Sequence, residues 1–173
     1  MRQEKIKLLT RINRGKLSAP SYLAALTEAL GEAVPQSALV SLAETDRITE
    51  SFRQGYRAAS SDQAVTYRRF FAAGQVEHVF QIAERLANQL PTEVGYLFIK
   101  RSEDCGAIRL RLAALLLHAA AVIRLDGDSL SVLSLGHQQG LLIDHNADDE
   151  DRRYEITIWG DQWSIVAMSC ETA

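Results

Sequence analysis

Apolar residues in the first half of the chain recur every three or four positions, a spacing that predicts helices. The clearest case is residues 75–90, where six apolar side chains share one face and Pro91 follows the end. A helix is also expected over 3–14, and a second one starts near Pro20, with Ser18 as its N-cap and Gly31 at its end. A short piece follows Pro35, and another helix is expected over 46–56. The last expected helix is capped by Asp62, contains Val65, Phe70 and Phe71, and breaks at Gly74.

The second half changes to the alternation of strands. Residues 94–100 predict a buried strand, and the Ala- and Leu-rich run 107–124 predicts a central helix, with 108–112 as an alternating segment that would also suit a strand. Two hairpins follow. In the first, a type II′ turn at Gly136-His137 would pair Val132 with Leu141 and Leu130 with Ile143; in the second, a loop at 160–162 would join strands 154–159 and 163–168.

Together these patterns predict an α+β fold. A helical N-terminal half would pack on a C-terminal antiparallel β-meander of four to five strands, with one central apolar helix against the sheet. The change of period near Pro91 divides the chain into a helical region, 1–90, and an α+β region, 91–173, either as separate units or as one domain over 1–173.

Composition narrows the class of protein. The chain has 173 residues, of which 47% are hydrophobic and 24% charged, which argues against disorder. Its net charge of −3 divides into about +3 for 1–90 and about −6 for 91–173, so a globally basic nucleic-acid binder is not expected. We expect no membrane contact, because no apolar run of about 20 residues is present. We also expect a cytoplasmic protein, because the sequence has no signal-peptide pattern and Cys105 and Cys170 form no motif.

Catalytic signatures are missing from the sequence. It has no Gly-x-Ser-x-Gly, no phosphate-binding glycine loop and no zinc-type histidine spacing. The sequence therefore predicts no cofactor and favours a protein that acts by binding over an enzyme.

The most specific candidate surface combines acidic and aromatic residues on the second hairpin. Indoles are frequent at binding hot spots, and carboxylates steer a basic partner. If the even-numbered face of the hairpin is core, both indoles face outward; if the N-terminal helices cover the other face, they are core instead. The candidate partner-binding residues are Trp159, Trp163, Asp148, Asp149, Glu150 and Asp151.

Two other chemistries are open at this level. Carboxylates and a histidine at the mouth of the sheet suit a divalent metal and a hydrolase, and the spacing of Asp144, Asn146, Asp148 and Glu155 partly matches a calcium loop. Arginines among aromatic residues suit stacking on single-stranded nucleic acid, although an ordinary amphipathic helix explains them as well. The metal candidates are Asp126, Asp128, Asp144 and His145, and the nucleic-acid candidates are Arg53, Arg57, Arg68 and Arg69.

From the sequence alone we expect a protein-binding module with a basic partner. Its role would be that of an immunity-type inhibitor, a secretion chaperone or a regulatory adaptor. A metal-dependent hydrolase and a nucleic-acid-binding protein are the alternatives.

Overall fold

The computed structural model describes residues 2–61, 66–126 and 129–169, and the side chains of Arg2, Glu4, Lys5 and Asp126 are outside that description. The fold is α+β, as predicted. Its helices are α1 (Arg2–Leu30), α2 (Leu42–Ser60), α3 (Val76–Gln89), α4 (Ser102–Cys105), α5 (Leu112–Leu117), α6 (Ala119–Asp126) and α7 (Asp161–Ser169), with 3₁₀ turns η1 (Gln36–Ala38) and η2 (Ala73–Gln75).

Six antiparallel strands form one sheet, slightly more than the four to five expected. They are β1 (Thr66–Phe71), β2 (Val94–Phe98), β3 (Ile108–Arg111), β4 (Ser129–Ser134), β5 (Gly140–His145) and β6 (Tyr154–Trp159), in the spatial order β1-β6-β5-β4-β2-β3. Because β1 comes from 1–90 and pairs with β6 from 91–173, the sheet draws on both regions. Whether each region is a domain of its own stays a prediction.

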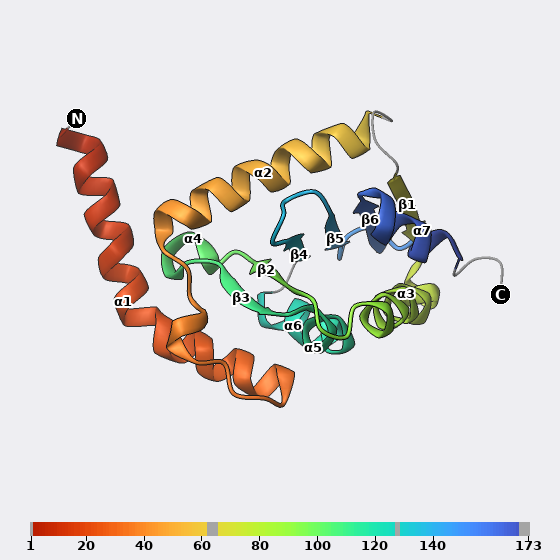
Figure 1. Cartoon of the computed structure of the whole chain (residues 1–173), viewed down its shortest axis with the longest axis horizontal. Helices are drawn as coiled ribbons and strands as arrows, with labels where there is room; N and C mark the ends of the chain where they lie inside the picture. The colour runs from red at the N-terminus through yellow and green to blue at the C-terminus, as the bar shows by residue number, and fades with distance from the viewer. Residues whose placement is uncertain (1, 62–65, 127–128, 170–173) are drawn as a thin grey trace.

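Helices cover both faces of the sheet (Figure 1). On one face, β4 contributes Leu130 and Val132 to the main hydrophobic core, and β5 contributes Leu141 and Ile143. The C-terminal half of α1 and the helices α3, α5, α6 and α7 supply the other side of this core. On the other face α2 crosses the strands and encloses a smaller core that contains Phe52 and Trp159. Burial of both cores removes most large apolar side chains from water, which is the main stabilising term of such a fold.

Two sequence predictions are confirmed residue by residue. The helix expected over 75–90 is α3, whose buried residues fall on the predicted face. The first hairpin has the predicted register, with Val132 opposite Leu141 and Leu130 opposite Ile143. Its turn is different, because the left-handed residue is His137 (φ 59°) and not Gly136; the His137 ring is 3.0 Å from the Ser51 hydroxyl, which fastens the turn to α2.

Two predicted elements in the first half of the chain are wrong. Pro20 does not start a second helix but lies inside the continuous α1, because buried residues on both sides, from Gly15 to Leu26, hold the helix against the rest of the protein. The expected helix containing Phe70 and Phe71 is strand β1, as its aromatic and β-branched residues favour; Asp62 and Val65 lie outside the described residues. The prediction for the run 107–124 is right in part: Ile108–Arg111 is strand β3, as the alternation at 108–112 allowed, and the remainder is helical but divided into α5 and α6.

The second hairpin does not exist, because 163–168 is helical. Gly160 has φ +92°, which turns the chain out of β6 and into α7. Trp163 and Ala167, four residues apart, are then both buried in the main core.

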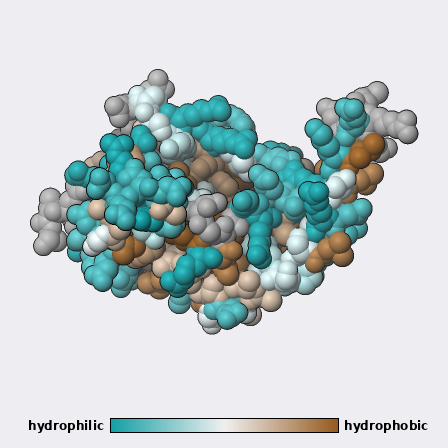
Figure 2. Space-filling view, turned by 180° about the vertical axis from the view of Figure 1, so that it is seen from behind, coloured by the Kyte–Doolittle hydropathy of each residue, from teal (hydrophilic) through white to brown (hydrophobic). Residues whose placement is uncertain are grey.

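The first half of α1 stands apart from the body (Figures 1 and 2). Ile6, Leu8, Leu9 and Leu17 are all exposed along it. Near the middle of α1, Gly15 packs directly against the Asp104 carbonyl and the hydroxyl of Ser18 lies 3.2 Å from the Cys105 sulfur, so α4 supports the helix there. None of the described helices is both long enough and apolar enough to cross a bilayer.

Candidate functional site

The two tryptophans are not at the surface, so the expected aromatic docking surface is wrong. Trp159 is 3% exposed beneath α2, and Trp163 is 0% exposed between α7 and the sheet. The physical reason is that helices cover both sheet faces and that Trp163 belongs to a helix, which directs it into the opposite core.

The acidic residues lie in the loop between β5 and β6. Asp148, Glu150 and Asp151 are exposed, and Asp149 is half-buried. The loop is internally braced, because the Asp149 carboxylate accepts hydrogen bonds from the backbone N–H groups of Asp151 (3.1 Å) and Arg152 (2.9 Å). Its carboxylates are therefore displayed by an ordered loop.

The structure does not gather the metal candidates that it describes. Asp144 and His145 are neighbours on β5, so their side chains point to opposite faces of the sheet, and His145 packs on the Tyr154 ring at 4.8 Å. Asp128 and the side chain of Asp126 lie outside the described residues. Within 2–61, 66–126 and 129–169, no three His, Cys, Asp or Glu side chains are placed to share a metal ion, which includes the calcium-like set around Asp144 and Glu155.

The nucleic-acid candidates separate into two places. Arg53 and Arg57 are exposed on α2, one turn apart, whereas Arg68 and Arg69 are consecutive on β1 and so point to opposite faces. The Arg68 guanidinium is 2.7 Å from the Glu155 carboxylate and is therefore neutralised. Only Arg53 of the four lines a cavity.

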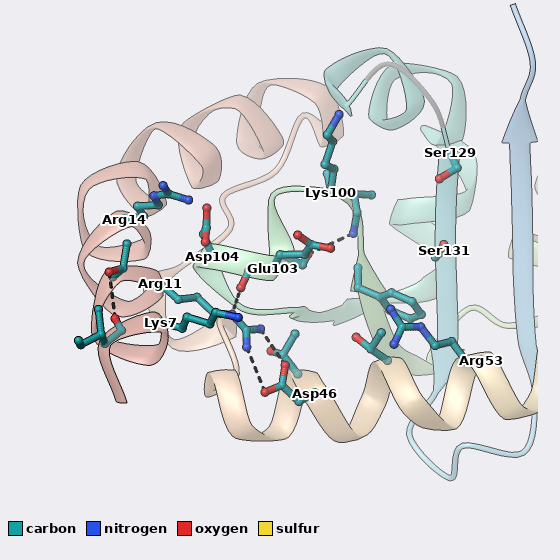
Figure 3. Close-up of a pocket in the computed structure, with 17 residues that line it drawn as sticks. Lys7, Arg11, Arg14, Asp46, Arg53, Lys100, Glu103, Asp104, Ser129 and Ser131 are labelled. Carbon is teal, nitrogen blue, oxygen red and sulfur yellow. Dashed lines mark hydrogen bonds and ion pairs between the residues drawn. The ribbon is translucent and has the colours of Figure 1, made fainter. Parts of the chain in front are cut away.

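That cavity, of about 990 Å³, lies between the first half of α1, α2, α4 and the sheet (Figure 3). Figure 2 shows the hollow between the projecting part of α1 and the body. Its lining contains five cationic side chains, three carboxylates and several hydroxyls: Lys7, Arg11, Arg14, Arg53, Lys100, Asp46, Glu103, Asp104, Thr10, Thr45, Thr49, Ser102, Ser129 and Ser131, together with Ile6, Phe98 and Ile99.

Arg11 fixes the geometry of the cavity by joining three elements. Its guanidinium forms a two-pronged ion pair with the Asp46 carboxylate, at 3.0 and 2.8 Å, which links α1 to α2. Its Nε also donates to the backbone carbonyl of Glu103 in α4. The hydrogen-bond donors of Arg11 are thus largely used by intramolecular partners, and this residue sets where α1, α2 and α4 meet.

Several polar side chains in the same cavity have no such partners. Among the residues described, Lys7, Arg14 and Arg53 form no ion pair or side-chain hydrogen bond, and neither do the hydroxyls of Thr49, Ser129 and Ser131. Cations and hydroxyl donors that converge on one concavity without internal partners are the groups that a bound anion needs.

The floor of the cavity is partly apolar. Phe98 is almost fully buried, and its ring is held edge-to-face by Phe52 with centroids 4.6 Å apart. Directly across the β2–β4 ladder from Phe98 is Ser131, which places a hydroxyl beside the aromatic ring. The floor can therefore contact both an apolar group and a hydrogen-bond acceptor.

Only part of this site could be predicted from the sequence. The cluster of six Lys and Arg residues within 1–16 was visible, as was Arg53. The free hydroxyls of Thr49 and Ser131 carried no signal, because isolated serines and threonines are common in helices and strands. No family model, no curated protein and no solved structure matches this chain.

Proposed function

We propose that this protein is a binding protein whose ligand is an anionic small molecule held in the α1–α2–α4 cavity. One observation carries the proposal: three cationic side chains, Lys7, Arg14 and Arg53, line a single cavity without ion-pair partners among the residues that the structure describes. All three side chains are exposed and hydrated in the free protein, and each can form a charge-assisted hydrogen bond once an anion binds.

The charge distribution supports this ligand class. The whole chain has a net charge of −3, yet the cavity lining holds five Lys or Arg side chains against three carboxylates. Asp46 is paired with Arg11, so it does little to offset the remaining cations. A concave site bounded by protein concentrates such a field and raises the local concentration of anions.

Cavity size and lining also agree with a small molecule. A volume of about 990 Å³ is at the upper end of typical small-molecule sites, which run from about 300 to 1,000 Å³. The buried ring of Phe98 offers an apolar contact at the floor, while Thr49 and Ser131 offer hydroxyl donors. A ligand that combines a charged group with a less polar body matches this lining.

We expect pyrophosphate, used as a simple anionic probe, to bind with 1:1 stoichiometry in low salt. The triple variant Lys7→Ala, Arg14→Ala, Arg53→Ala should weaken this binding at least about 100-fold, because hydrogen bonds to charged groups contribute about 1.5–3 kcal/mol each. Asp46→Asn should strengthen binding, because it releases Arg11 to act as a fourth free cation. Isothermal titration calorimetry measures both changes.

The matched control removes the same charge elsewhere. The variant Arg47→Ala, Arg109→Ala, Arg124→Ala lowers the net charge equally, and all three residues are exposed and outside the cavity lining. It should retain wild-type affinity within about threefold, the scale of a weak long-range effect. Equal loss in both triple variants, or no binding by the wild type, would refute the proposal.

A second candidate function is protein binding through the acidic loop, with a partner that has a basic surface. The observation in its favour is that hydrogen bonds order the loop carrying Asp148, Asp149, Glu150 and Asp151. Two of them lie within the loop, and a third runs from the Ala73 N–H, outside the loop, to the Glu150 carbonyl at 3.0 Å. A preordered charged loop loses little entropy on contact. A protein that binds a basic partner through such a loop would act as an immunity-type inhibitor, a secretion chaperone or a regulatory adaptor.

This candidate predicts a salt-sensitive partner. A variant with Asp148→Asn, Glu150→Gln and Asp151→Asn keeps Asp149 and its bracing bonds, so it should fold normally but lose at least about tenfold in association rate with a basic partner recovered by pull-down. Surface plasmon resonance at two salt concentrations measures the rate. An unchanged rate would exclude the loop as the contact surface.

A further inference from the structure

We infer that the ligand of the α1–α2–α4 cavity carries two anionic groups separated by a spacer of several bonds. This inference rests on the proposed function and specifies the class of its ligand. It follows from how the free and the neutralised cations are arranged along the walls (Figure 3).

The free cations belong to two walls. Lys7 and Arg14 lie on α1, about one turn on either side of Arg11, while Arg53 lies on α2. The ion pair of Arg11 with Asp46 marks where the two helices meet. Arg53 is seven residues beyond Asp46, which is about two turns or roughly 10 Å along the axis of α2. The α2 end of the cavity, at Arg53, is therefore separated from the α1 wall, where Lys7 and Arg14 lie on either side of Arg11.

The contact between α1 and α2 carries no free charge, because Arg11 and Asp46 are paired there. Arg11 is bound by both carboxylate oxygens of Asp46 and by the Glu103 carbonyl, so its charge is balanced and its donors are mostly used. An anion placed at this point would meet the Asp46 carboxylate as well as the guanidinium. A neutral spacer fits there, with the anionic groups at either side.

The two ends also differ in their other polar groups. At the α2 end, Thr49 is one turn from Arg53, and the hydroxyls of Ser129 and Ser131 line the same cavity from β4. At the α1 end, the hydroxyl of Thr10 already donates to the Ile6 carbonyl at 2.9 Å. The α2 end thus combines one cation with three free hydroxyls, and the α1 end relies on two cations. Phosphate esters suit both ends, because their oxygens accept from cations and hydroxyls alike.

A small molecule explains this arrangement better than a nucleic-acid strand. A strand needs a continuous basic track, but beyond Arg57 the next described arginine on that face of the sheet, Arg68, is neutralised by Glu155.

The experiment compares probes of graded geometry by calorimetry in low salt: 1,6-hexanediol bisphosphate, hexyl phosphate, pyrophosphate and a ten-residue oligothymidylate. The bisphosphate should bind at least about tenfold tighter than hexyl phosphate and tighter than pyrophosphate, because its second group binds intramolecularly. Arg53→Ala alone, and Lys7→Ala with Arg14→Ala, should each reduce the bisphosphate to the affinity of hexyl phosphate. Arg47→Ala is the matched control on α2 and should leave the advantage intact.

The outcomes separate this inference from the proposed function. If pyrophosphate binds in the cavity but the bisphosphate has no advantage, the two-group inference is wrong and anion binding stands. If the oligothymidylate binds tightest and loses affinity in the Arg53→Ala variant, the ligand is a nucleic acid and the inference is also wrong. If no probe binds, both the inference and the proposed function fall.

Discussion

Replacing Trp159 with alanine is expected to lower the free energy of unfolding by about 3–5 kcal/mol, the range for removing a large buried aromatic side chain. The indole is the centre of the smaller core: Phe52 meets it edge-on with centroids 4.8 Å apart, and Tyr56 does so at 6.5 Å. Urea denaturation monitored by circular dichroism measures the loss, which should appear as a lower midpoint with an unchanged slope.

Two glycines make room for this indole, and they provide the internal check. A Cβ at Gly55 in α2 would lie 2.3 Å from Trp159 Nε1, and one at Gly140 in β5 would lie 2.1 Å from Cζ2. Gly55→Ala and Gly140→Ala should therefore each cost about 1–3 kcal/mol by overpacking. In the Trp159→Ala background both should cost much less, since the clash is gone. Additive effects would contradict the packing of Trp159 between these glycines.

Trp163→Ala should have a similar effect, about 3–5 kcal/mol, because the indole is fully buried in the main core. The matched control is Ile165→Ala, two residues along the same helix, whose side chain is 62% exposed and should change stability by no more than about 0.5 kcal/mol. The same denaturation experiment compares them. Comparable losses in the two variants would contradict the helical placement of 161–169.

The pair of tryptophans also shows where sequence reasoning reached its limit. Residues 163–168 alternate well enough to suit a strand, and no local feature opposes that interpretation except the glycine that turns the chain at 160. The choice is made by the main core, which accepts Trp163 and Ala167 on one helical face. A short apolar segment of this kind is ambiguous until its neighbours in space are known.

Other elements were accessible from the sequence because their signal is local. The apolar positions of α3 repeat over four turns, and the register of β4 with β5 follows from four apolar residues sharing one face. The segment Thr66–Phe71 was misassigned although its residue types favour a strand, because its pairing partner, β6, is almost 90 residues away.

The candidate site depends on contacts that are even less visible in sequence. Arg11 and Asp46 are 35 residues apart, and Arg11 and Glu103 are 92 apart. These contacts decide that Arg11 is neutralised while Lys7 and Arg14, on the same helix, have no ion-pair partner among the described residues. A run of basic residues in the sequence cannot show which of its members have partners, and that difference is the basis of the proposed site.

The most direct test of anion binding is a ¹H–¹⁵N correlation spectrum of the uniformly labelled protein, titrated with pyrophosphate in low salt. We expect saturable shifts at the amides of Lys7, Thr49 and Ser131, which come from three different elements around one cavity, and no shifts at Asp148 to Asp151 in the acidic loop. Shifts confined to residues outside the cavity, or none up to millimolar probe, would contradict the account.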